Sequence, residues 1–130
     1  MYLDANIFVY ANFDVGKKGS NARKLLRSLS SGKSATTSAL ALDEVMWVAW
    51  KNKQKDKIRD VIEDIYQVKN LKIVPVSTSI PLAAISLMET HKLRPRDAFH
   101  VAIMQELGEE SIASDDADFD KVEDIKRMKL

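Results

Sequence analysis

The alternation of short apolar runs with longer amphipathic segments constrains the fold of this chain most strongly. Strand-like runs occur at 1–3, 34–37, 71–76 and 111–114, and 125–130 is either a final edge strand or a tail. Helical periodicity fills the intervals at 7–13, 21–29, 39–53, 55–68, 80–91 and 96–107. This order predicts an α/β domain over residues 1–130, three-layered α/β/α, with a central, mostly parallel sheet of four to five strands.

Local signals place the ends of several helices. Asn6 and Ser38 are expected to cap the helices that follow them, and Pro81 and Gly108 mark a helix start and a helix end. Residues 16–19, which begin and end with glycine, are expected to form a loop.

Composition narrows the class of protein. The 130 residues include no cysteine and two histidines, which excludes disulfides, thiolate metal sites and a His-rich zinc centre. The net charge of +1 is not that of a strongly basic duplex-binding domain. No apolar run approaches the roughly 20 residues of a membrane span, and Met1 leads almost directly into the first strand. These features predict a cytoplasmic protein without a membrane segment or targeting sequence.

Acidic residues recur where elements of such a sheet end or begin. Asp4 follows the first strand, Glu44 lies inside the helix after the second, and Asp97 begins a helix that is apolar nearly all round. A further acidic group, which contains Asp115, Asp116 and Asp118, follows the strand at 111–114. Carboxylates that converge in one cleft repel one another unless a cation neutralises them, and oxygen-only ligation suits Mg²⁺ or Mn²⁺. Such ions are typical of phosphodiester cleavage.

Four segments together resemble a PIN domain, and more narrowly the small VapC-like ribonucleases of toxin–antitoxin pairs. They are 2–6, 38–45, 96–102 and 114–119, and the resemblance covers essentially the whole chain. It implies a PIN-like fold with catalytic and metal-binding residues Asp4, Glu44, Asp97 and Asp116, supported by Asn6, Ser38, Ser114 and Asp118. Asp116 is preferred to Asp115 because the family places this acid two residues after Ser or Thr, but Asp115 and Asp118 compete for the role.

The resemblance also implies an activity and partners. The activity is Mg²⁺- or Mn²⁺-dependent hydrolysis of single-stranded or loop RNA by water, which leaves a 5′-phosphate and a 3′-hydroxyl. The partners are a small antitoxin whose tail reaches the acidic cleft, and a second copy of the chain in a homodimer.

Several alternatives stay open on sequence alone. The chain is a toxin, a stand-alone PIN ribonuclease in RNA processing, or a catalytically degenerate module that binds RNA or protein. A phosphatase of the haloacid-dehalogenase type would require an acid where Asn6 stands. Arg94 and Arg96 either contact RNA phosphates near the cleft or belong to a solvated basic face. His100 is interpreted as a satisfied core or rim histidine, with orientation of Asp97 as the second reading.

Overall fold

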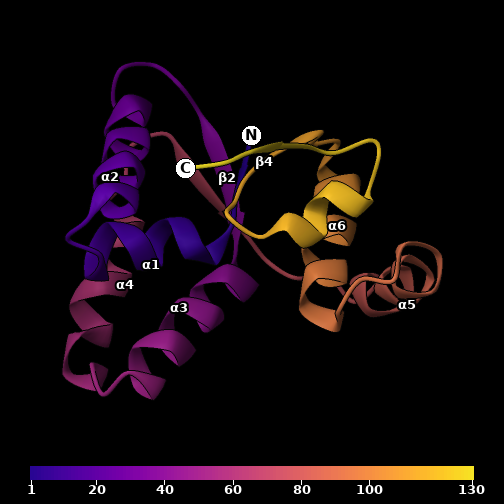
Figure 1. The fold of residues 1–130 in the computed structure, drawn as a ribbon, viewed down its shortest axis with the longest axis horizontal. Helices are drawn as coiled ribbons and strands as arrows, with labels where there is room; N and C mark the ends of the chain where they lie inside the picture. The colour runs from indigo at the N-terminus through magenta and orange to yellow at the C-terminus, as the bar shows by residue number, and fades with distance from the viewer.

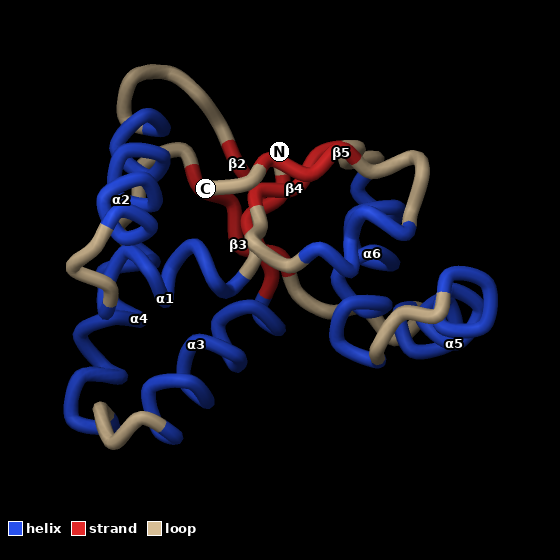
Figure 2. The backbone as a smooth tube through the Cα atoms, viewed as in Figure 1, coloured by secondary structure: helices blue, strands red, loops and turns tan.

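A single five-stranded sheet forms the centre of the molecule. The computed structural model describes all 130 residues, and every strand pair in the sheet is parallel, in the order β3-β2-β1-β4-β5 (Figures 1 and 2). The strands are β1 (Tyr2–Leu3), β2 (Ala35–Ser38), β3 (Leu71–Val74), β4 (Ser111–Ala113) and β5 (Lys126–Met128). The chain end at 125–130 therefore contributes an edge strand.

Helices cover both faces of this sheet. They are α1 (Ala5–Phe13), α2 (Lys17–Leu29), α3 (Ala39–Lys51), α4 (Ile58–Tyr66), α5 (Ile80–His91) and α6 (Pro95–Leu107), with 3₁₀ turns at Lys55–Lys57 and Ala117–Lys121. In Figure 1 the first four helices lie to one side of the strands, and α5 and α6 lie to the other. The predicted three-layer α/β fold is confirmed. None of these helices has the length and apolar character needed to cross a membrane.

The two faces of the sheet are sealed by two separate hydrophobic cores. Successive side chains of a strand point to opposite faces, and the strands follow this rule residue by residue. Tyr2 and Ile112 join the core that α5 and α6 complete. Leu3 and Ala113, the next residues of the same strands, join the core that α1–α4 complete. β1 and β4 therefore each contribute to both cores.

Two predictions about helix starts are wrong. Asp4 rather than Asn6 caps α1, and its Oδ1 accepts from the backbone N–H of Ala5 at 2.7 Å. Residues 16–19 are not a loop, because α2 begins at Lys17. The carboxylate of Asp14 accepts from the N–H groups of Gly16 and Gly19 at 3.0 and 2.6 Å, which satisfies free donors at this helix start. A Cβ on Gly19 would lie 1.8 Å from the Asp14 carbonyl oxygen, so the glycine permits close packing there.

The chain connections create a crevice beside β1. From β1 the chain passes through α1 and α2 to β2 on one side, whereas β4 pairs with the other side of β1. Ligands of open α/β sheets bind outside the carboxyl ends of strands at such a switch point.

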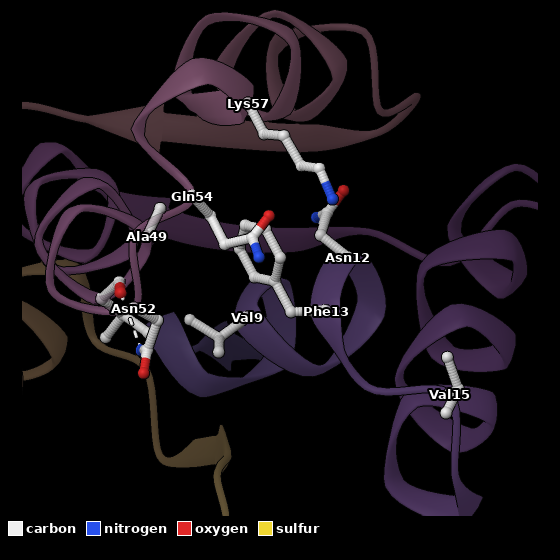
Figure 3. Close-up of a pocket in the computed structure, with 9 residues that line it drawn as sticks. Val9, Asn12, Phe13, Val15, Ala49, Asn52, Gln54 and Lys57 are labelled. Carbon is white, nitrogen blue, oxygen red and sulfur yellow. Dashed lines mark hydrogen bonds between the residues drawn. The ribbon is translucent and has the colours of Figure 1, made fainter.

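Apart from this crevice, a hollow of about 440 Å³ lies between α1, α3 and the turn that precedes α4. Val9, Phe13 and Val48 are among its apolar residues, and Asn12, Asn52, Gln54 and Lys57 are its polar ones (Figure 3).

Candidate metal centre

Asp4 is held at the carboxyl end of the central strand by three short hydrogen bonds. It is 7% exposed, and besides the Ala5 N–H its carboxylate accepts from Ser114 Oγ and Asn6 Nδ2, both at 2.6 Å. Ser114 follows β4, the neighbour of β1 in the sheet. The Ser114 hydroxyl also accepts from the Asp116 N–H at 3.0 Å, so one serine links Asp4 to the loop that carries Asp116.

Glu44 and Asp97 reach the same region from two helices. Glu44 lies in α3, whose first turn is capped by Ser38 at the end of β2, and it is half-buried, whereas its neighbour Asp43 is exposed. Asp97 lies in the first turn of α6, is 8% exposed, and benefits from the positive end of the helix dipole.

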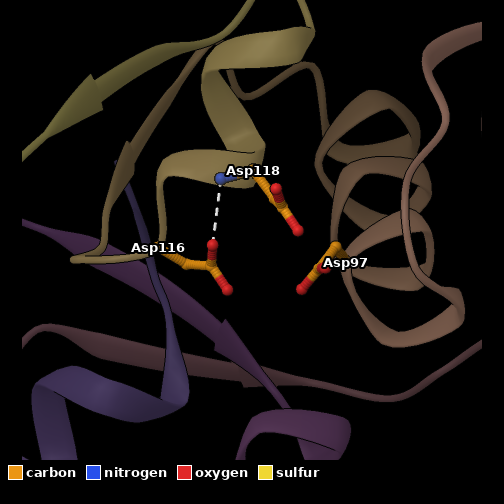
Figure 4. Close-up of side chains that lie close together, drawn as sticks. All are labelled: Asp97, Asp116 and Asp118. Carbon is orange, nitrogen blue, oxygen red and sulfur yellow. Dashed lines mark hydrogen bonds between the residues drawn. The ribbon is translucent and has the colours of Figure 1, made fainter.

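The acids after β4 point in different directions. Asp116 caps the 3₁₀ turn by accepting from the Asp118 N–H at 2.9 Å. Asp97, Asp116 and Asp118 each offer a carboxylate oxygen, and these oxygens lie within 4.8 Å of one another (Figure 4). Asp115 instead forms an ion pair with Lys18 of α2. Geometry therefore separates Asp116 and Asp118 from Asp115, which sequence could not do.

The four acids named by the sequence meet in one cleft. Asp4, Glu44, Asp97 and Asp116 all line a hollow of about 230 Å³, together with Asn6, Tyr10 and Arg96. The four come from the end of β1, from α3, from α6 and from the loop after β4. Residues more than 100 positions apart in the chain are thus neighbours around a single opening.

The charged forms of the carboxylates in the cleft are electrostatically unfavourable. Burial raises the pKa of Asp4, and the charge of Glu44 raises it further, although His100 and Ser114 act against both. Burial also raises the pKa of Asp97, and Arg94 opposes this while Asp116 adds to it. An added cation would relieve this electrostatic penalty.

Arg94 supplies one positive charge to three of the acids. Its Nε lies 3.1 Å from Asp97 Oδ2 and 3.1 Å from Asp118 Oδ2, and its Nη2 lies 2.8 Å from Asp116 Oδ2. Asp118 is also paired with Lys121 at 2.8 Å. Lys121 and, to a smaller extent, Arg94 lower the pKa of Asp118. Arg96, two residues on, lines the cleft but forms no ion pair, so the two arginines are not equivalent.

His100 connects Glu44 to the core. Its Nε2 lies 2.5 Å from Glu44 Oε1 and 3.9 Å from Asp4 Oδ1, and its Nδ1 lies 2.8 Å from the hydroxyl of Tyr2. The Tyr2 hydroxyl in turn lies 2.6 Å from Ser38 Oγ. Burial alone would lower the pKa of His100, but the hydrogen bond to Glu44 and the charges of Asp4 and Glu44 outweigh it and raise the pKa.

This donor set fits a hard divalent cation. All of its charged ligand atoms are carboxylate oxygens, which Mg²⁺ and Mn²⁺ prefer. The carboxylate oxygens of Asp97, Asp116 and Asp118, which lie within 4.8 Å of one another, would draw closer together to share one ion at metal–oxygen distances of about 2.1 Å. Asn6 Oδ1 is buried without a hydrogen-bond partner, and it offers a further acceptor to a hydrated ion.

Comparison with known families agrees with the fold. The model described as the PIN domain matches residues 1–125. The chain belongs to the PIN domain family. No curated protein is significantly similar to this PIN domain in sequence.

Solved structures share the fold at low sequence identity. VapBC2 from Rickettsia felis, bound to a DNA fragment from its promoter, is 16% identical, with a TM-score of 0.76 over 99% of this chain and 97% of that chain. VapC20 from Mycobacterium tuberculosis, a toxin that cleaves the sarcin–ricin loop, is 14% identical, with a TM-score of 0.74 and 92% of each chain covered. FitAcB from Neisseria gonorrhoeae is 16% identical, with a TM-score of 0.73 over 97% of this chain and 94% of that chain. The structural neighbours of this PIN domain thus include toxins of toxin–antitoxin complexes.

Most residues that the sequence singled out line the cleft or contact a residue that lines it, but some have different contacts from those expected. His100 is the buried, satisfied histidine that was predicted, yet its partner is Glu44 rather than Asp97. Ser38 contacts Tyr2 rather than an acid. Sequence reasoning missed Tyr2 and Lys18. The strand alternation that turns Tyr2 toward α6 was an available signal, whereas nothing in the sequence indicates the pairing of Lys18 with Asp115.

Proposed function

We propose that this PIN domain is an endoribonuclease that hydrolyses RNA phosphodiester bonds with the help of Mg²⁺ or Mn²⁺. The observation that carries the proposal is the convergence of Asp4, Glu44, Asp97 and Asp116 in one cleft at the carboxyl edge of the sheet. A bound divalent ion supplies positive charge to the phosphate and activates the attacking water.

The protein's own groups have separable roles in this proposal. Asp4, Asp97 and Asp116 hold the ion, and Glu44 completes the negative cleft from α3. Ser114 and Asn6 fix the carboxylate of Asp4, and Asp118 holds Arg94 and Lys121. Arg96, the unpaired cation of the cleft, contacts an RNA phosphate.

An RNA cleavage assay tests the proposal. We expect the purified chain to cut single-stranded or loop RNA with added Mn²⁺ or Mg²⁺, to stop when EDTA is added, and to leave 5′-phosphates. Asp4→Asn and Asp97→Asn should abolish cleavage while circular dichroism shows an intact fold. Cleavage at the wild-type rate by both variants would contradict the proposal.

We further propose that the enzyme is the toxin of a toxin–antitoxin pair and acts in the cytoplasm. The solved neighbours described above include toxin–antitoxin complexes. The hollow between α1 and α3 supports an antitoxin partner, because Val9 and Val48 line both that hollow and the acidic cleft. Met46, Trp47 and Trp50, exposed on α3, support a homodimer. Co-purification with the product of an adjacent reading frame, and sedimentation of the isolated chain, test the two partners. A stand-alone ribonuclease would need no such neighbouring gene.

A non-catalytic binding module is the second candidate. The observation in its favour is Arg94, which already provides Asp97, Asp116 and Asp118 with a cation. Calorimetric titration with Mn²⁺ separates the two candidates, since a nuclease binds the ion and the module gives no heat of binding.

A further inference from the structure

We propose that single-stranded RNA leaves the acidic cleft across the beginning of α2 and that its phosphates lie in a pocket of three lysines behind that helix. The proposal rests on the ribonuclease function and adds the path of the substrate. We call this pocket the lysine pocket. Its cations are Lys24 of α2, Lys33 of the α2–β2 connection and Lys129, which follows β5.

The lysine pocket is built for a polyanion. It encloses about 330 Å³, and none of the residues that line it is acidic. Its cations come from three separate segments of the chain, and all three are exposed and form no ion pair. Leu25, Met128 and Leu130 supply apolar surface between the charges. In a chain with a net charge of only +1, three free lysines around one hollow are a local concentration of positive charge.

A further hollow, which we call the joining hollow, adjoins the cleft on the side of α2. It measures about 370 Å³ and shares Asn6, Tyr10 and Asp116 with the cleft, and Lys18 and Asp115 form its far side. Lys18 precedes Lys24 by six residues, about 9 Å along the helix axis. Met128, which lines the lysine pocket, accepts a hydrogen bond through its carbonyl oxygen from the N–H of Ser114 at 3.1 Å, one residue before Asp115. Both α2 and the segment after β5 therefore bring the lysine pocket close to the joining hollow.

The chemistry along this route matches a single RNA strand. The carboxylates of the cleft repel phosphates, so affinity must come from cations placed beyond them. Lys18, which is paired with Asp115, has its Nζ 5.1 Å from the centroid of the Tyr10 ring, so the joining hollow places a cation beside an aromatic ring. Proteins that bind single strands combine such stacking faces with basic grooves. Arg96 begins the route on one side of the acids and the lysine pocket ends it on the other.

Binding of a fluorescent 12-nucleotide single-stranded RNA, measured by anisotropy over a range of NaCl in EDTA, tests this path without cleavage. The variant is K24Q/K33Q/K129Q, and the matched control is K51Q/K69Q/K72Q, three exposed lysines outside every hollow described above. We expect the lysine-pocket variant to bind the RNA about tenfold more weakly. The slope of the logarithm of its binding constant against the logarithm of the NaCl concentration should become shallower by about 2, at roughly 0.7 per lost phosphate contact. The control should bind like the wild type.

Equal affinities for the two triple variants, or an unchanged affinity of the lysine-pocket variant, would overturn the path. Cleavage with Mn²⁺ separates this failure from failure of the ribonuclease function. A dinucleoside monophosphate has its only phosphate in the acidic cleft and none left for the lysine pocket, so we expect the lysine-pocket variant to cut it like the wild type and to cut the 12-nucleotide RNA poorly. If the wild type cuts neither RNA, the ribonuclease function fails, while the binding comparison still decides the path.

Discussion

His100 Nε2 lies 2.5 Å from Glu44 Oε1, so a histidine that is 1% exposed fixes the carboxylate of a cleft residue 56 positions away in the chain. The Tyr2 hydroxyl holds the opposite ring nitrogen and is itself held by Ser38. A buried chain of hydrogen bonds therefore runs from the core to one of the four acids. Groups of this kind orient metal ligands and are costly to remove.

Replacing His100 should weaken metal binding through Glu44. His100→Phe leaves the Tyr2 hydroxyl without one partner and releases Glu44, so we expect a loss of about 1–3 kcal/mol in the free energy of unfolding. Calorimetry should show Mn²⁺ bound about 10–100-fold more weakly. His100→Gln, which keeps a donor, should recover part of this affinity. His91→Phe, at the other and more exposed histidine, is the control, and unchanged Mn²⁺ affinity in folded His100→Phe would refute the role.

The acids after β4 should differ sharply in metal binding. Asp116 lines the cleft, whereas Asp115 is paired with Lys18. We expect Asp116→Asn to reduce Mn²⁺ affinity at least tenfold and Asp115→Asn to leave it within about twofold. The reverse order in a calorimetric titration would mean that the wrong acid is assigned to the ion.

Arg94 and Arg96 should have opposite effects. Arg94 competes with an ion for Asp97, Asp116 and Asp118, and because its own side chain is 66% exposed, each of these pairs contributes only a few tenths of a kcal/mol. We therefore expect Arg94→Gln to strengthen Mn²⁺ binding about fivefold. Arg96→Gln should leave Mn²⁺ binding unchanged and weaken RNA binding, because Arg96 has no acidic partner to release. Weaker Mn²⁺ binding by Arg94→Gln would show that Arg94 supports the site rather than competing for it.

The start of α2 should give the protein a pH-dependent component of stability. The N–H groups of Gly16 and then Gly19 lower the pKa of Asp14 below its ordinary value of 3.8. A carboxyl whose pKa is lower in the folded state stabilises the fold above its unfolded pKa and loses that effect as the pH falls through its folded pKa. Urea unfolding should show Asp14→Asn less stable than the wild type at pH 7, with the difference shrinking below about pH 4. Asp124→Asn, at an exposed acid, controls for the loss of charge. A difference that persists at low pH would contradict this origin.

The fold and the members of the cleft could be predicted because they depend on local pattern and topology. Alternating strand-like and helical segments specify a parallel sheet, and acids at the ends of its strands must gather at one edge. Asp4 needed only these two facts, whereas Asp97, at the start of a helix that follows another helix, was assigned to the cleft by the resemblance to PIN domains. Ser38 as a helix cap followed from short-range chemistry.

The contacts of the cleft could not be predicted, because they depend on side-chain directions across long stretches of chain. Tyr2 and His100 are 98 residues apart, and their meeting requires β1 and α6 to pack at one particular depth. Asp115 and Asp116 are adjacent, and only the course of the loop after β4 decides which one faces the cleft. The short hydrogen-bonded turn after Asp14 likewise made a helix start look like a glycine loop.

Glu44 and Asp43 together test whether the acidic cleft cuts RNA with a divalent ion. The two acids are neighbours in α3, but only Glu44 faces the cleft, while Asp43 is exposed. The measurement is the initial rate of Mn²⁺-dependent cleavage of one single-stranded RNA by the wild type, Glu44→Gln and Asp43→Asn. We predict a rate at least 100-fold lower for Glu44→Gln and a wild-type rate for Asp43→Asn. Equal rates for the two variants would contradict cleavage of RNA by the acidic cleft.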